Sequence, residues 1–72
     1  WIWQNIMNKI GFTIPTSLNV RSGPSRQYTV VDRLKFNTQI TIIDEAQEES
    51  GYTWYSIGSS RWVEAGFVKL MP

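Results

Sequence analysis

The apolar residues of this 72-residue chain alternate with polar ones in short runs, and this spacing constrains the fold more than any other feature. Leu18 and Val20 alternate with polar neighbours, and Ile40 and Ile42 repeat the pattern. Successive side chains of a β-strand point to opposite faces, so a period of two predicts strands with one buried face. From Thr16 onward the sequence therefore predicts an all-β fold.

Residues typical of turns separate these runs and set the expected number of strands at five or six. Gly23 lies in a loop between Ser22 and Ser25, where we expect a positive φ, and Asn37 is expected to adopt a left-handed conformation in the next turn. The acidic run from Asp44 to Glu49 is interpreted as a solvated hairpin loop with its flanks. Short strands joined by such turns indicate a small barrel or sandwich. The expected strands are 16–21, 29–34, 39–45, 52–57, 61–64 and 68–70.

The first ten residues follow a different period. Trp3, Ile6, Met7 and Ile10 are spaced as one face of a helix, and Gly11 follows where a helix would end. This pattern predicts a short N-terminal helix in a linker or packing segment, residues 1–15, ahead of a barrel domain at 16–72. In the alternative interpretation, 12–14 pair as the first strand of the barrel.

The composition excludes several classes of chemistry. The sequence has no Cys and no His, so it offers no thiol nucleophile, no Ser-His triad and no usual zinc ligand set. We therefore expect no catalytic residues, no metal and no cofactor. The net charge of +1 is too small for a domain that binds nucleic acid. The apolar stretches are too short for membrane insertion. Because the chain begins with Trp1, we expect it to be a piece of a longer polypeptide.

The string Leu18-Asn19-Val20-Arg21-Ser22-Gly23-Pro24-Ser25 resembles the opening signature of the bacterial SH3-like (SH3b) family. Weaker blocks resemble the family in the same order: Tyr28-Thr29-Val30-Val31 with Leu34, 38–43, Trp54-Tyr55-Ser56-Ile57, 58–63, and Phe67-Val68 with Leu70. The resemblance implies an SH3-like β-barrel of five to seven short strands. It also implies a module, found in endolysins and autolysins, that carries a bacterial or phage cell-wall hydrolase to peptidoglycan. An extracellular location at the cell wall follows from that role.

Aromatic residues are the main candidates for ligand contact. A period of two places Tyr55 and Ile57 on one face and Trp54 on the other, so Trp54 is expected to face outward. Alternatively, Trp54 packs against the loop from Ser22 to Tyr28 and is buried. Together, Tyr28, Trp54 and Tyr52 are expected to form a shallow aromatic groove for a flexible peptide or a sugar.

Two further residues have competing interpretations. Arg21 either binds carbonyl groups of the adjacent loop, which we favour, or holds a carboxylate of a wall peptide. Trp62 is expected to be a core residue rather than a ligand contact, by a small margin.

These observations lead to one functional expectation and one alternative. We expect a non-catalytic module that binds the stem peptide, cross-bridge or glycan of peptidoglycan and targets an attached peptidoglycan hydrolase to it. In the alternative, the domain is a protein–protein adaptor that binds a peptide of its parent chain or of a partner. Small barrels of this kind serve both purposes, so the fold does not decide between them.

Overall fold

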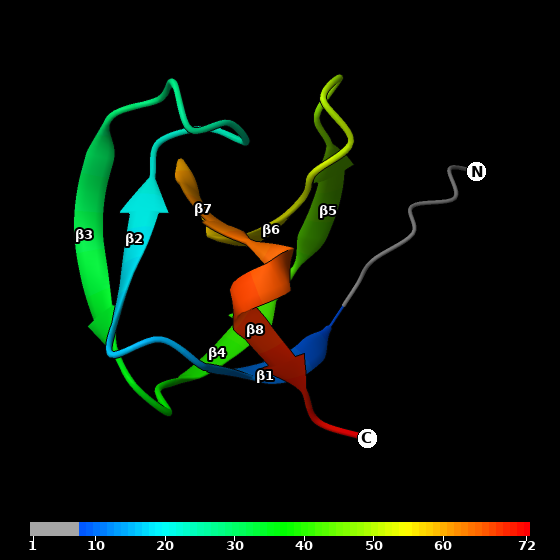
Figure 1. Cartoon of the computed structure of the whole chain (residues 1–72). Helices are drawn as coiled ribbons and strands as arrows, with labels where there is room; N and C mark the ends of the chain where they lie inside the picture. Colours follow the sequence, from blue (N-terminus) through cyan, green and yellow to red (C-terminus); the bar gives the residue numbers. More distant parts are fainter. Residues whose placement is uncertain (1–7) are drawn as a thin grey trace.

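The strands of the protein form two sheets that together enclose one core (Figure 1). The structure is a computed structural model that describes residues 8 to 72. Over these residues the chain forms eight strands and one 3₁₀ helix: β1 (Lys9–Thr13), β2 (Ser17–Arg21), β3 (Val30–Lys35), β4 (Gln39–Ile42), β5 (Asp44–Gln47), β6 (Thr53–Gly58), β7 (Arg61–Glu64), η1 (Ala65–Phe67) and β8 (Val68–Leu70). The all-β fold predicted from the alternation is confirmed.

A five-stranded sheet has the order β3-β2-β7-β6-β5, and a three-stranded sheet has the order β4-β1-β8. All pairs are antiparallel. The strand expected at 39–45 is divided at Ile43, where the chain leaves β4 and continues into β5 of the other sheet. The Ile43 amide donates to the carbonyl of Ser56 at 2.9 Å. One bent segment therefore connects the two sheets, and β1 and β4 run across the direction of β2 and β3 (Figure 1).

The core contains the residues that the alternation assigned to one face of each early strand, together with Val63 and Val68, which it did not assign. Ile42 is fully buried, whereas the next residue, Ile43, is 43% exposed. Tyr55 and Ile57 pack against the core from β6, as expected from their shared face. The buried cluster comprises Leu18, Val20, Ile40, Ile42, Val63 and Val68.

Two turn predictions have different outcomes. Asn37 has a φ of 60°, which confirms its left-handed conformation. The positive φ expected at Gly23 is wrong, because Gly51 is the only glycine with positive φ among residues 8 to 72. Gly23 is instead constrained by close packing: a Cβ at this position would lie 2.5 Å from the ring of Tyr28.

The acidic run is only partly a loop. Its first residues form β5, in which Glu45 lies opposite Tyr55 of β6. The loop itself is shorter and is closed by two hydrogen bonds, from the Gly51 amide to the Glu48 carbonyl at 2.9 Å and from the Glu48 amide to the Tyr52 carbonyl at 2.8 Å.

The helix predicted at the N-terminus is wrong at its C-terminal end. Ile10 and Gly11 lie in β1, which pairs with β4 on one side and β8 on the other. A helix of two turns is unstable alone, and pairing on both sides of a strand satisfies more backbone groups. The residues predicted for the start of the helix, Trp3, Ile6 and Met7, lie outside the described part of the chain. The alternative of a first strand that includes Phe12 is confirmed.

Across residues 8 to 72, no helix has the length and apolar character needed to cross a bilayer.

Candidate binding groove

The face of the five-stranded sheet opposite the core carries large and charged side chains. Trp54 of β6 lies opposite Glu64 of β7, and Trp62 of β7 lies opposite both Ser56 and Arg21. Residues directly opposite one another in a sheet share a face. These strands therefore place two tryptophans, an arginine and a carboxylate on one surface, which we call the outer face.

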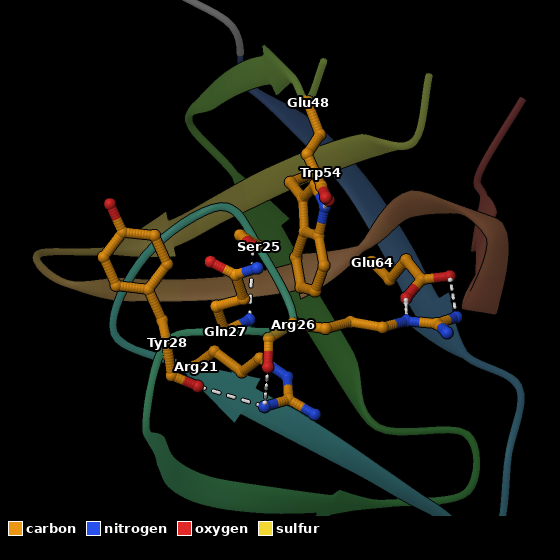
Figure 2. A network of polar contacts seen from close by, with 8 residues as sticks. All are labelled: Arg21, Ser25, Arg26, Gln27, Tyr28, Glu48, Trp54 and Glu64. Atoms are coloured by element: carbon orange, nitrogen blue, oxygen red, sulfur yellow. Dashed lines mark hydrogen bonds and ion pairs between the residues drawn. The ribbon is translucent and has the colours of Figure 1, made fainter. Parts of the chain in front are cut away.

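Trp54 has the predicted face but not the predicted exposure. Its side chain is only 1% exposed, so the expectation that it faces solvent is wrong. The indole Nε1–H donates to Glu48 Oε1 at 2.8 Å, which satisfies the one polar atom of the ring (Figure 2). Arg26 of the loop 22–29 lines the same groove as Trp54, and the burial of Trp54 agrees with the alternative that expected it to be buried.

Arg26 joins the first loop to the outer face (Figure 2). Its Nε and Nη2 donate to Oε1 and Oε2 of Glu64 at 2.9 and 3.0 Å, and its Cζ lies 5.0 Å from the centre of the Tyr52 ring. Glu64 is buried, and a buried carboxylate requires such a partner. The hydrogen bonds to Glu64, together with its negative charge, raise the pKa of Arg26 above its ordinary value. The ion pair therefore fixes the loop over the sheet.

Arg21 holds the same loop through hydrogen bonds to its backbone carbonyl groups. Its Nη1 donates to the carbonyl oxygens of Arg26 at 2.9 Å and of Tyr28 at 3.0 Å. These are the contacts of the structural role that the sequence favoured. A hydrogen bond from the Gln27 amide to Ser25 Oγ, at 3.1 Å, shapes the turn between the two carbonyls. Arg21 thus holds both ends of this turn, and the side chain of Arg26 ties the loop to Glu64.

A groove of about 320 Å³ lies where these elements meet. Phe67, which is 40% exposed, and Pro15 provide apolar surface, while Arg21, Arg26 and Glu64 provide charge. The complete lining is Pro15, Ser17, Leu18, Asn19, Arg21, Arg26, Trp54, Glu64 and Phe67. This mixture of fixed apolar and charged groups is suited to a short peptide with both kinds of group.

The three aromatic residues expected to share one groove lie in different places. Tyr28, 48% exposed, borders a second hollow with Ser25 and Gln27, and its ring points away from Glu64 (Figure 2). Tyr52, 47% exposed, borders a third hollow. The prediction of one common aromatic groove is therefore wrong for the described part of the chain. Alternation along strands does not specify how loops return over them. That each residue contacts a ligand stays a prediction.

Trp62 is half-buried on the outer face, between its neighbours Arg21 and Ser56. It lies outside the core cluster, so the preference for a core position is wrong, and a ligand contact stays a prediction. The sequence reasoning did not identify Arg26, Glu64 or Phe67 as site residues. Only Glu64 had a local signal, because period two places it on the face of Trp62 and a carboxylate there requires a cation.

The fold and the groove define a class: a small SH3-like β-barrel with a groove of mixed apolar and charged lining on the outer face of its larger sheet. Residues 16–69 match the family model of the bacterial SH3 domain, so the chain belongs to this family, as the resemblance implied. Members of the family are generally cell-wall or protein-binding modules and are typically non-catalytic.

One characterised relative comes from a cyanobacterium. The chain is 33% identical over 60 residues to the serine/threonine-protein kinase D of Synechocystis sp. (strain ATCC 27184 / PCC 6803 / Kazusa). The aligned region covers 76% of this chain but only 12% of the kinase. No solved structure matches the chain.

Proposed function

We propose that this domain is a non-catalytic module that binds a peptide of peptidoglycan in the groove of the outer face. The domain would thereby hold an attached peptidoglycan hydrolase at the cell wall, outside the cell. The observation that carries the proposal is the groove itself, whose walls are fixed by the ion pair between Arg26 and Glu64 and by the buried Trp54. A preformed site loses little conformational entropy when a flexible peptide binds.

The groove presents groups that complement a short wall peptide. Phe67 and Pro15 offer apolar surface to small aliphatic side chains, and Arg26 offers hydrogen-bond donors. One site of this size binds weakly, but a polymer repeats its ligand many times. A tethered enzyme therefore stays near its substrate through effective concentration.

A second candidate function is a protein–protein adaptor that binds a peptide of its parent chain or of a partner. The similarity to a serine/threonine-protein kinase favours this alternative, because that relative is named as a protein kinase and not as a peptidoglycan hydrolase. The matched part is only 12% of the length of the kinase. The same groove would serve both functions, since both ligands are peptides.

Sedimentation with insoluble peptidoglycan tests the main proposal. Phe67→Ser should weaken binding about tenfold, which corresponds to about 1.4 kcal/mol for one lost apolar contact. Phe36→Ser is the matched control, because Phe36 is also exposed, at 65%, but does not line the groove. Neither variant removes a buried side chain, and amide spectra check that both stay folded.

The outcomes separate the two functions. Sedimentation of the intact domain, reduced by Phe67→Ser and unchanged by Phe36→Ser, supports wall binding in the groove. Equal sedimentation of both variants contradicts the assignment of the groove. If the domain does not bind peptidoglycan of several chemotypes but does bind a segment of its own parent chain, it is an adaptor. Release of reducing ends or free amines from the wall would contradict a non-catalytic role.

A further inference from the structure

The guanidinium of Arg26 has two edges that can each bind a carboxylate, and the protein uses only one of them. Nε and Nη2 face Glu64 and donate to its two oxygens. The other edge consists of Nη1 and the remaining N–H of Nη2, and a planar guanidinium presents this edge as a second fork. Within residues 8 to 72, no protein acceptor bonds to Nη1. A complete hydrogen-bonding edge is therefore left for a ligand.

The free edge is both accessible and held in place. The Arg26 side chain is 55% exposed, although its partner Glu64 is only 11% exposed in its side chain. The Tyr52 ring lies against the guanidinium, with 5.0 Å between Cζ and the ring centre. An arginine fixed at one edge and across one face loses little freedom when a ligand binds its other edge.

The charges of the groove favour an anion. Arg21 and Arg26 contribute two positive charges, and Glu64 contributes one negative charge. Arg21 donates to neutral carbonyl oxygens, so its charge is not cancelled by the groups that it holds. Charge-assisted bidentate contacts between guanidinium and carboxylate groups are among the strongest hydrogen bonds that proteins make.

The size and apolar surface of the groove indicate the kind of anion. Its volume of about 320 Å³ lies near the lower limit of ligand sites, which range from roughly 300 to 1,000 Å³. Pro15 and Phe67 line the same groove as Arg26. A short peptide end, with a carboxylate beside a small aliphatic side chain, matches this combination better than a long chain that continues in both directions.

We propose that the free edge of Arg26 binds the C-terminal carboxylate of a short peptide, and that Glu64 is the positioning residue that orients the guanidinium. The inference deepens the proposed function and rests on the same groove. Because the inference rests on the proposed function, we assign the carboxylate to a wall peptide, whose terminal residues have D configuration. Preference for a peptide of L configuration would assign it to a protein instead.

The first experiment compares a free carboxylate with an amide on the unmodified domain. The probes are N-acetyl-D-alanyl-D-alanine, its L,L form, and the C-terminal amide of each. NMR titration follows the Arg26 Nε–H and Trp54 Nε1–H signals. The free acid should bind about tenfold more tightly than its amide, because the amide removes one charged acceptor. Equal affinities of acid and amide would overturn the proposal.

The second experiment tests Arg26 itself. Arg26→Lys keeps the positive charge but removes the planar fork, so the free acid should bind about tenfold more weakly. Arg61→Lys is the matched control, because Arg61 also pairs with a carboxylate, Asp32, at 2.9 Å but does not line the groove. Unchanged binding by a folded Arg26→Lys contradicts the proposal. If that variant unfolds, the comparison of acid and amide on the unmodified domain still decides.

The results distinguish this inference from the proposed function. A domain that sediments with peptidoglycan but binds acid and amide equally retains its proposed function and refutes the carboxylate site. If the domain binds the acid more tightly than the amide but does not sediment with peptidoglycan, the result supports the carboxylate site and refutes wall binding. Preference for the D,D acid supports a wall peptide as the source, and preference for the L,L acid assigns the site to a protein terminus.

Discussion

Gly23→Ala should introduce an unfavourable contact in the loop of residues 22–29 only when Tyr28 is present. A Cβ at Gly23 would lie 2.5 Å from Cδ1 and Cε1 of the Tyr28 ring and 2.6 Å from Cζ. The backbone of Gly23 is not in the left-handed region, so an alanine there meets no strain of its own. The effect should therefore come from the ring alone, which a double-mutant cycle with Tyr28→Ala isolates.

The expected magnitude follows from two opposing effects. Carbon atoms normally approach to about 3.5–4.0 Å, so the ring must move by about 1 Å. Overpacking costs about 1–3 kcal/mol, and the half-exposed ring of Tyr28 can turn toward solvent, so we expect about 1 kcal/mol. Alanine also restricts the unfolded chain, which stabilises the protein by about 0.4–1 kcal/mol. Gly23→Ala should thus be nearly neutral in the natural sequence and clearly stabilising in Tyr28→Ala.

Denaturant unfolding of the four proteins of the cycle measures the coupling, which should be about 1 kcal/mol. In a domain of this size that energy corresponds to a difference in melting temperature of about 4–8 °C. Gly66→Ala is the matched control, because a Cβ there meets nothing within 4 Å. It should stabilise the protein equally with and without Tyr28. A zero coupling energy between Gly23 and Tyr28 would refute the packing argument.

Two other predictions concern groups that the structure pairs. Trp54→Phe removes the donor to Glu48 and should destabilise the domain by about 2 kcal/mol, whereas Glu48→Ala, which removes the acceptor, should cost about 1 kcal/mol in thermal unfolding. An equal melting temperature for Glu48→Ala and the exposed control Glu49→Ala would contradict the bond. The hydrogen bond from Arg61 lowers the pKa of Asp32, so its stabilisation is complete above the ordinary carboxyl pKa of about 3.9 and is lost as the pH falls through the lower folded-state value. In Asp32→Asn the melting temperature should therefore fall less steeply below about pH 4 than in the unmodified protein. An unchanged dependence of the melting temperature on pH would refute the pairing.

The features that the sequence predicted correctly depend on neighbouring residues. Leu18 and Val20 are buried because alternate side chains of one strand share a face, and Ile40 and Ile42 follow the same rule. Asn37 has a positive φ, and asparagine is one of the few residues other than glycine that tolerate that conformation. These preferences act over two to four residues, so they are visible without a structure.

The features that the sequence did not predict depend on distant contacts. Trp54 lies on the predicted face, but it is buried and bonded to Glu48, and strand alternation carries no information about such loop contacts. Arg26 and Glu64 are 38 residues apart, so no local pattern connects them. Gly23 suggested a backbone requirement, whereas the actual constraint is the ring of a residue five positions later. The site was therefore much less predictable than the strands.

The position of β1 has a practical consequence for anyone who isolates this domain. β1 lies between β4 and β8 and pairs with both, yet it precedes the residues that match the family, 16–69. A fragment trimmed to the matched region would leave the amide and carbonyl groups of two strands exposed as templates for another copy. Copies that join through these edges would form aggregates that sediment by themselves and that present many grooves at once. Such a fragment would therefore give an apparent wall affinity higher than that of the single domain.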